Sequence, residues 1–262
     1  MTRPLRCWSG VATMVLAVVI GARAGEVPTS ERRSDYELMG PELRRMQDDD
    51  SANPGMLWVF DGEALWRRND GSAGKSCADC HGEATNSMKG VATRYPAFDK
   101  TLGRPIDLEG RIYACRTRHQ GAEPLAFESR ELLSLTAYVG RQSKGLPFNI
   151  ADDAATLPFV AAGRAIFEQR QGQLNLSCAQ CHDDNWGQKL GGATIPQGHP
   201  TGYPLYRLEW QSLGSLQRRL RNCLVGMRAV PYAYGTPEMT ELELFLARRA
   251  RGLALETPAV RP

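Results

Sequence analysis

Apolar residues recur three and four positions apart in several segments of the chain, and this spacing predicts amphipathic helices. The clearest examples are the segments 129–144, 215–227 and 237–251. Their apolar positions are Leu132, Leu135 and Val139, then Leu216, Leu220, Cys223, Leu224 and Met227, and finally Leu242, Phe245 and Leu246. The pattern therefore predicts a mainly α fold.

Two shorter helical segments reveal an internal repeat. Gly62–Trp66 and Gly163–Phe167 share their arrangement of small and apolar residues, and each is followed at the same distance by a Ser-Cys pair. Further along, Arg111-Ile-Tyr-Ala-Cys115 resembles Arg219-Leu-Arg-Asn-Cys223, and a predicted closing helix follows each. Because the same elements occur twice in the same order, we predict two tandem domains of related structure.

We place the two domains at residues 56–150 and 151–262. The segment 146–158 contains two prolines and a pair of aspartates, which is typical of a linker. Residues 25–55 are charged and punctuated by glycine and proline, so we expect them to lie across the surface as an N-terminal extension.

The residues 1–24 have the layout of a secretory signal peptide. Arg3 and Arg6 form a positively charged start, residues 11–20 form an apolar run, and Ala22-Arg23-Ala24 fits a cleavage site with small residues. The apolar run is short for a membrane span, so we expect cleavage and no stable membrane insertion. For a Gram-negative source, the predicted location is the periplasm.

The charge balance argues against nucleic acid as a partner. The full chain has 32 lysines and arginines against 29 aspartates and glutamates. Three of the arginines and no acidic residue lie in the predicted signal peptide, so the exported chain is close to neutral. A nucleic-acid-binding surface needs an excess of basic groups, which this composition does not provide.

Four of the seven cysteines lie in two C-x-x-C-H motifs, the pattern that attaches c-type haem. The two thiols of each motif bind the haem covalently, and the adjacent histidine is placed as the proximal iron ligand. Two copies behind an export signal favour this reading over a zinc site or a redox dithiol. They predict two tandem cytochrome c domains with one haem c group each. The motifs are Cys77-Ala-Asp-Cys80-His81 and Cys178-Ala-Gln-Cys181-His182.

The repeat also indicates candidates for the second axial ligands, Cys115 and Cys223. A thiolate is a strong ligand of ferric haem and lowers its reduction potential. The alternatives are His119 for the first haem and Met227 or His199 for the second. A disulfide between the two cysteines is a further alternative, because an oxidising compartment permits it.

Arginines cluster around Cys223, and one of them is a candidate for binding an anion. In a helix spanning 215–227, Arg219 lies one turn before Cys223 on about the same face. A guanidinium group binds anionic oxygens bidentately, so Arg219 can hold an anion beside the thiolate. Each arginine of the cluster is also a candidate for pairing with a haem propionate or for a solvated position. The others are Arg218, Arg221 and Arg228.

With these residues in place, the chain resembles the SoxA family, the dihaem subunits of thiosulfate-oxidising SoxAX complexes. The resemblance covers nearly all of the chain after the signal peptide. It includes the segment 47–59, both C-x-x-C-H motifs, 111–115 and 219–227. Some members lack the first haem motif, which this chain retains.

The resemblance implies a function that residue spacing cannot supply. It implies an L-cysteine S-thiosulfotransferase that joins thiosulfate to a cysteine of the carrier SoxYZ and passes two electrons to a cytochrome c. It further implies that Cys223 is a haem ligand found as a persulfide, that Arg219 holds thiosulfate, and that a small monohaem cytochrome, SoxX, is the partner subunit. The rival interpretations are a dihaem electron carrier without substrate chemistry and a dihaem peroxidase.

Overall fold

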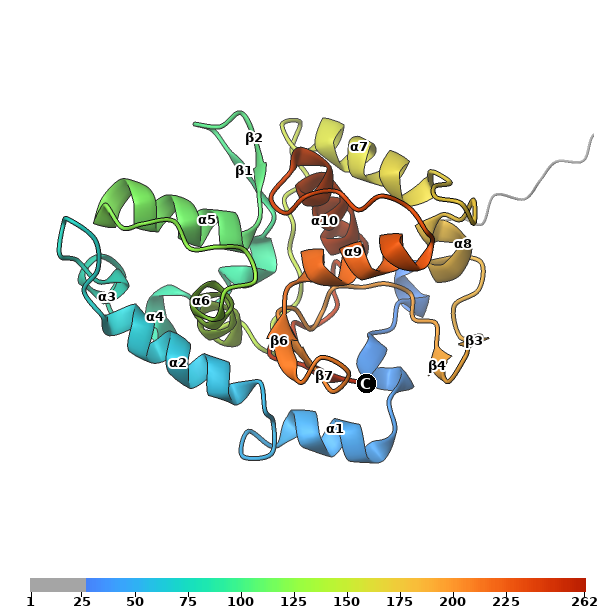
Figure 1. Cartoon of the computed structure of the whole chain (residues 1–262), viewed down its shortest axis with the longest axis horizontal. Coiled ribbons are helices and arrows are strands. Elements are labelled where there is room, and N and C mark those ends of the chain that lie inside the picture. The colour runs from blue at the N-terminus through green and yellow to red at the C-terminus, as the bar shows by residue number, and fades with distance from the viewer. Residues whose placement is uncertain (1–26) are drawn as a thin grey trace, which may run out of the picture.

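Helices form most of the ordered elements, and two similar groups of them lie side by side (Figure 1). The structure is a computed structural model that describes residues 27–262. The predicted signal peptide lies outside the described residues. The mainly α fold with an internal repeat is confirmed, whereas the exact domain boundaries stay a prediction.

The first half is built on a pair of packed helices, α2 (Met56–Arg67) and α6 (Arg130–Arg141). Gly62 lies where α2 crosses α6, and a Cβ atom there would clash with the backbone carbonyl of Ser134. The glycine therefore allows the two helices to approach closely. The elements that come between α2 and α6 in the sequence are α3 (Cys77–His81), α4 (Ala84–Ser87), η3 (Ala92–Arg94), β1 (Ala97–Asp99), β2 (Arg104–Ile106), α5 (Leu108–Cys115) and the π-helical turn η4 (Arg116–Gln120).

The second half repeats this plan with α7 (Leu157–Glu168) packed against α10 (Pro237–Arg249). Gly163 takes the place of Gly62, and a Cβ atom there would clash with the carbonyl of Glu241. The intervening elements are α8 (Cys178–His182), β3 (Lys189–Leu190), β4 (Ala193–Thr194), β5 (Leu205–Arg207), β6 (Ser212–Gly214) and α9 (Leu216–Gly226).

A short strand pair precedes the cysteine-bearing helix in both halves. β1 pairs antiparallel with β2, and β5 pairs antiparallel with β6 with Tyr206 opposite Leu213. In the second half a third strand, β7 (Val260–Arg261), adds to β5 in parallel, with Tyr206 opposite Val260. The order β6-β5-β7 brings the C-terminus of the chain next to the second candidate site.

The π-helical turn η4 marks the place where the two repeats lose register. In the first half Ser72 N donates to the carbonyl of Gly121, and in the second Gln173 N donates to the carbonyl of Arg228. Gly121 lies one residue further beyond its cysteine than Arg228 does, so η4 accommodates an inserted residue. Both positions have positive φ, 60° for Gly121 and 56° for Arg228.

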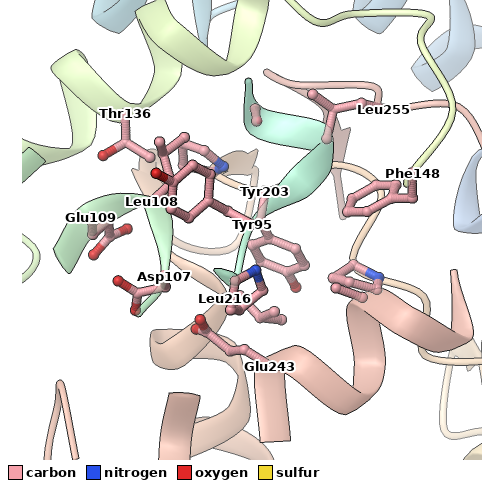
Figure 2. A pocket seen from close by; sticks show the side chains of 15 residues that line it. Tyr95, Asp107, Leu108, Glu109, Thr136, Phe148, Tyr203, Leu216, Glu243 and Leu255 are labelled. Carbon is pink, nitrogen blue, oxygen red and sulfur yellow. The ribbon is translucent and has the colours of Figure 1, made fainter. Parts of the chain in front are cut away.

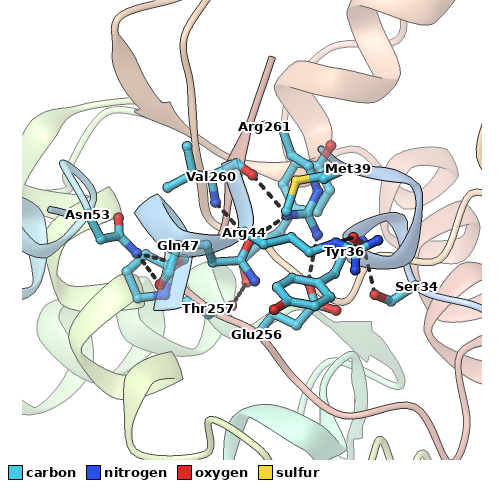
Figure 3. Close-up of polar contacts among 12 residues, drawn as sticks. Ser34, Tyr36, Met39, Arg44, Gln47, Asn53, Glu256, Thr257, Val260 and Arg261 are labelled. Carbon is cyan, nitrogen blue, oxygen red and sulfur yellow. Dashed lines mark hydrogen bonds and ion pairs between the residues drawn. The ribbon is translucent and has the colours of Figure 1, made fainter. Parts of the chain in front are cut away.

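The N-terminal segment is anchored on the second half of the molecule. It contains η1 (Thr29–Glu31), η2 (Asp35–Leu38) and α1 (Pro41–Asp48). Gln47 of α1 is buried, and its Oε1 accepts hydrogen bonds from Val260 N and from Arg261 (Figure 3). The extension expected for residues 25–55 therefore crosses the surface but is fixed by buried polar contacts.

The predicted linker is partly built into the core. Phe148 and Ile150 are buried, and Pro147 forms an isolated β-bridge with Ala254. These contacts tie the connection between the halves to the C-terminal segment of the chain. Across residues 27–262, no helix combines the length and apolar character that crossing a membrane requires.

Candidate functional site

Both C-x-x-C-H motifs form single-turn helices that begin with the same cap. Ser76 Oγ accepts a hydrogen bond from Asp79 N, while the Asp79 carboxylate accepts one from Ser76 N. Ser177 and Gln180 make the same reciprocal pair at the start of α8. This capping box satisfies backbone donors that a short helix leaves unpaired, and it fixes the helix that carries the two thiols and the histidine.

His182 is oriented as a metal ligand. Its Nδ1 lies 2.7 Å from the carbonyl oxygen of Pro196, so this nitrogen carries the proton and Nε2 is left to bind iron. Burial lowers the pKa of His182, which favours the neutral imidazole that ligation needs. Gly198, at φ 74°, packs on the ring, where a Cβ atom would lie 3.0 Å from His182 Cγ.

Cys223 on α9 meets the second motif. Burial and the nearby Cys223 thiol raise the pKa of Cys178 to about 12, and the same two causes raise the pKa of Cys181. In the first half, Cys115 lies close enough to Cys77 for its charge to raise the pKa of that thiol, after the larger effect of burial. Each repeat therefore places its distant cysteine beside its own motif.

The disulfide alternative is wrong for this structure. None of the six cysteines within residues 27–262 is joined to another by a disulfide, Cys115 and Cys223 included. The physical reason is their location, because each lies with the motif of its own half.

A cavity of about 380 Å³ brings the second set of residues together. One part of its wall is apolar. Another part contains a thiol that could attach haem, Cys178, and two groups that could bind iron, the His182 imidazole and the Cys223 thiol. An apolar slot with a correctly oriented imidazole and adjacent thiols fits a covalently attached haem. The apolar lining includes Phe167, Leu220, Leu242 and Leu246.

The alternative axial ligands lie in less suitable places. His119 is exposed, at the π-helical turn beyond Cys115. Met227 is buried at the C-terminal end of α9 and is absent from the lining of the cavity. His199 does line the cavity, but its Nε2 lies 3.2 Å from Gln197 Oε1, and it belongs to the segment that packs beside His182. The geometry thus favours Cys115 and Cys223, whose ligation stays a prediction.

Arg219 projects into the same cavity as Cys223. Its side chain makes no hydrogen bond or ion pair with any residue in the described range 27–262. Burial works against its charge, but the Cys223 thiol, Tyr203 and Asp35 outweigh it and raise the pKa of Arg219. A charged, unpaired guanidinium beside a thiol is suited to bind an anion.

The other arginines of the cluster have different environments. Arg218 lies over the Trp210 ring at 4.3 Å and 3.9 Å from Glu128 Oε2. Arg221 donates to the carbonyl of Tyr232, and Arg228 is exposed. None of the three lines the cavity that contains Cys223.

The structure adds residues that the sequence did not reveal. Asp35 and Arg207 line the cavity, although they come from the N-terminal segment and from β5. Burial raises the pKa of Asp35 to about 6, and the charges of Arg261, Arg219 and Arg207 act in the opposite direction. No local motif marks either residue, because only the folded chain brings them to Cys223.

A second, smaller cavity of about 90 Å³ lies between the two halves (Figure 2). Three carboxyl groups line it, from Asp107 and Glu109 of the first half and Glu243 of α10. Gln217 Nε2 donates to Asp107 Oδ2 at 2.8 Å. This cavity contains no haem-motif residue, so it is separate from the candidate site.

Comparisons with known proteins agree with this arrangement. The sequence model of the family described as SoxA/TsdA, cytochrome c domain, matches residues 61–148 and 162–255. The chain is 39% identical over 236 residues to the L-cysteine S-thiosulfotransferase subunit SoxA of Pseudaminobacter salicylatoxidans, covering 89% of this chain and 82% of that protein. It is 36% identical to the protein of the same name from Rhodovulum sulfidophilum, covering 88% and 80%.

A solved structure is similar over the same range. The crystal structure of SoxXA from P. pantotrophus matches with a TM-score of 0.85 and 32% identity, over 88% of this chain and 87% of that chain. Each segment matched by the cytochrome c family contains one C-x-x-C-H motif, so the protein binds two haem c groups. The chain belongs to the SoxA family of dihaem cytochromes c.

Proposed function

We propose that this protein is the catalytic subunit of an L-cysteine S-thiosulfotransferase that conjugates thiosulfate to a cysteine of a SoxYZ sulfur carrier. The observation that carries the proposal is the cavity in which Cys223, His182 and Arg219 meet. It combines a sulfur nucleophile, a haem site and a free cation for an anionic substrate. The names of the relatives supply the substrate class.

The reaction is an oxidation that forms one sulfur–sulfur bond. The carrier thiol and thiosulfate lose one proton and two electrons, and the carrier sulfur becomes bonded to the outer sulfur of thiosulfate. Haem c, when bound, would accept these electrons one at a time and pass them to a cytochrome c. The same two-electron oxidation could first join Cys223 to the outer sulfur of thiosulfate. Attack of the carrier thiolate on that sulfur would then transfer the thiosulfonate group and release the Cys223 thiolate.

In this proposal, residues of the second half share the work. Cys178 and Cys181 would hold the haem covalently, His182 and Cys223 would bind its iron, and Cys223 would also carry the reacting sulfur. Arg219 holds the sulfonate oxygens, which offsets the repulsion between a dianion and a thiolate. The persulfide that the resemblance implies at Cys223 stays a prediction, which mass spectrometry of the peptide tests.

The first half has a residue that corresponds to each of these haem-binding residues. We propose that Cys77 and Cys80 would hold the first haem covalently and that His81 and Cys115 would bind its iron. Its position in the other half of the repeat suits electron relay or a structural role. The same proposal includes a SoxX-like monohaem subunit, because the similar solved structure is titled SoxXA. It also includes export to the periplasm behind the predicted signal peptide.

Replacing Cys223 by alanine tests the assignment, with Cys115→Ala as the matched control. We expect Cys223→Ala to abolish formation of the carrier conjugate, measured by mass spectrometry, and reduction of the acceptor cytochrome c. Both haems should remain attached, because attachment depends on the C-x-x-C-H cysteines. Cys115→Ala should retain much more turnover.

Two results would contradict the proposal. One is the loss or reversal of the expected contrast, in which Cys223→Ala keeps most of its turnover or Cys115→Ala is the inactive variant. The other is a wild-type complex that exchanges electrons with cytochrome c but never forms a conjugate, which would establish the dihaem electron carrier instead.

A further inference from the structure

The two halves differ at one charged position, the last residue of the first strand in the hairpin that precedes the cysteine-bearing helix. Arg111 on α5 and Arg219 on α9 correspond, because each lies four residues before its cysteine. The strands before these helices also correspond, since β1 and β5 both follow a Tyr-Pro pair and both form an antiparallel hairpin. β1 ends with Asp99, whereas β5 ends with Arg207. A carboxylate in the first half is replaced by a guanidinium in the second.

In the first half, the strand residue neutralises the helix arginine. Arg111 Nη2 donates to Asp99 Oδ2 at 2.8 Å, and its Nε donates to the Tyr95 hydroxyl at 3.2 Å. Asp99 is 4% exposed, and its Oδ1 also accepts from two backbone N–H groups of the hairpin turn. Arg111 is therefore already occupied by an internal anion.

In the second half, both arginines line the cavity that contains Cys223. The side chain of Arg207 is 15% exposed, and its Nε is buried without a hydrogen-bond partner. Within residues 27–262, the carboxylate that pairs with Arg207 is Glu209, at 3.3 Å, and that side chain is 64% exposed. Both residues line one cavity, and the charge of Arg219 lowers the pKa of Arg207 after the larger effect of burial.

The other charged groups of the cavity leave this pair with an excess of positive charge. Arg261 is paired with Glu256 at 2.5 Å and also donates to Gln47 (Figure 3). Lys189 is held by a threonine hydroxyl of the neighbouring strand. Asp35 contributes one carboxyl group from η2. Lys189 keeps its charge, so three cationic side chains of the lining, those of Arg207, Arg219 and Lys189, face the single carboxyl side chain of Asp35. This excess of positive charge favours a dianion over a monoanion.

We propose that Arg207 is a second substrate-binding residue, which forms with Arg219 a two-arginine site that selects a dianionic sulfur compound over a monoanionic one. The proposal deepens the proposed function and rests on it. Each guanidinium offers a planar fork of hydrogen-bond donors to sulfonate oxygens. Two guanidinium groups can therefore neutralise the two negative charges of a dianion. The first half, with Asp99 in this position, has no such site.

The experiment compares two substrates that differ by one charge. Thiosulfate is a dianion, and methanethiosulfonate keeps the nucleophilic sulfur but replaces an oxygen by a methyl group, so that it is a monoanion. Turnover of the full complex with each is measured for wild type, Arg207→Ala, Arg207→Lys, Arg207→Asp and Arg248→Ala. Arg248 lies on α10, pairs with Asp152 and is absent from the cavity lining, so its variant is a control for the loss of one positive charge.

We expect Arg207→Ala to lower kcat/KM for thiosulfate by roughly tenfold or more, and kcat/KM for methanethiosulfonate much less. Arg207→Lys should recover part of the loss, because it restores charge without the fork. Arg207→Asp should lose more than alanine, because it recreates beside Arg219 the internal ion pair of the first half. Arg248→Ala should match wild type with both substrates.

Two outcomes would overturn the inference. If Arg207→Ala behaves like Arg248→Ala, Arg207 does not contact the substrate. If it lowers kcat/KM for both substrates equally and shifts the midpoint potential of a haem, Arg207 pairs with a haem propionate instead. A wild-type complex that fails to conjugate thiosulfate would instead refute the proposed function, so the two failures are distinguishable.

Discussion

At the scale of single residues, the distinctive feature is an unpaired arginine one helical turn from a thiol. Removing a charged hydrogen-bonding partner of a substrate typically costs about 1.5–3 kcal/mol. We therefore expect Arg219→Ala to lower kcat/KM for thiosulfate by roughly ten- to a hundredfold. Arg219→Lys should restore only part of it, because lysine provides the charge but not the planar fork.

The same change in the first half is the control for Arg219→Ala. Arg111→Ala removes a guanidinium that is paired with Asp99, so its effect on thiosulfate turnover should be much smaller. Steady-state kinetics with carrier and acceptor cytochrome c measures both. If Arg111→Ala were the more damaging variant, the roles of the two halves would be reversed.

The chemically reactive residues could be predicted from the sequence, whereas their surroundings could not. A C-x-x-C-H motif identifies its own thiols and histidine, and the repeat then identifies Cys115 and Cys223. The carbonyl of Pro196 that orients His182 belongs to a loop without a recognisable pattern. The role proposed for Arg207 can be recognised only when β5 is known to border the cavity, because Arg207 and Cys223 are brought to that cavity by segments distant in sequence.

At the scale of helices, the repeat depends on two glycines at helix crossings. A Cβ atom at Gly163 would clash with the backbone of α10, which cannot move as freely as a side chain. We expect Gly163→Ala to destabilise the protein by about 1–3 kcal/mol through overpacking. Gly62→Ala should have a similar effect in the first half, measured by urea unfolding.

Gly40 supplies the control for this prediction. It precedes α1 with φ −67°, and a Cβ atom there would meet nothing within 4 Å. Gly40→Ala therefore creates no overlap, and we expect it to cost only the roughly 0.5 kcal/mol that separates glycine from alanine at an N-cap. If Gly163→Ala were equally harmless, the crossing would have to tolerate more separation than the structure indicates.

The helices follow from the sequence much better than the connecting elements do. The predicted segments 129–144, 215–227 and 237–251 correspond to α6, α9 and α10, because each has a continuous apolar stripe. The hairpins β1-β2 and β5-β6 have strands of three residues, too short for a readable alternation. The inserted residue at η4 is visible only when hydrogen bonds of the two halves are compared.

At the scale of the whole molecule, buried carboxyl groups lie where the two halves meet (Figure 2). Glu243 is buried on α10 and shares a hydrogen bond with Asp107, the N-cap of α5. Glu109 is also buried, and its Oε2 has no hydrogen-bond partner. The interface between the halves therefore contains acidic groups that are costly to ionise.

These groups predict a pH dependence of stability with a definite sign. Burial, followed by the charges of Asp107 and Glu109, raises the pKa of Glu243 well above its usual value, and burial likewise raises the pKa of Glu109. Above the pKa of an unfolded glutamate, near 4.3, the native state holds protons that the unfolded chain releases. Their contribution to the free energy of unfolding therefore falls as pH rises, until the raised native pKa is passed.

Replacing Glu243 by glutamine isolates this contribution. Glutamine can still donate to Asp107 but has no charge to bury, so Glu243→Gln should gain stability over wild type as pH rises from 5 to 8 by about 1 kcal/mol or more. Glu238→Gln, an exposed change on the same helix, is the control. Urea unfolding of the haem-loaded protein at both pH values measures the difference. An equal effect of Glu243→Gln at pH 5 and pH 8 would show that Glu243 is ionised in the folded protein throughout this range.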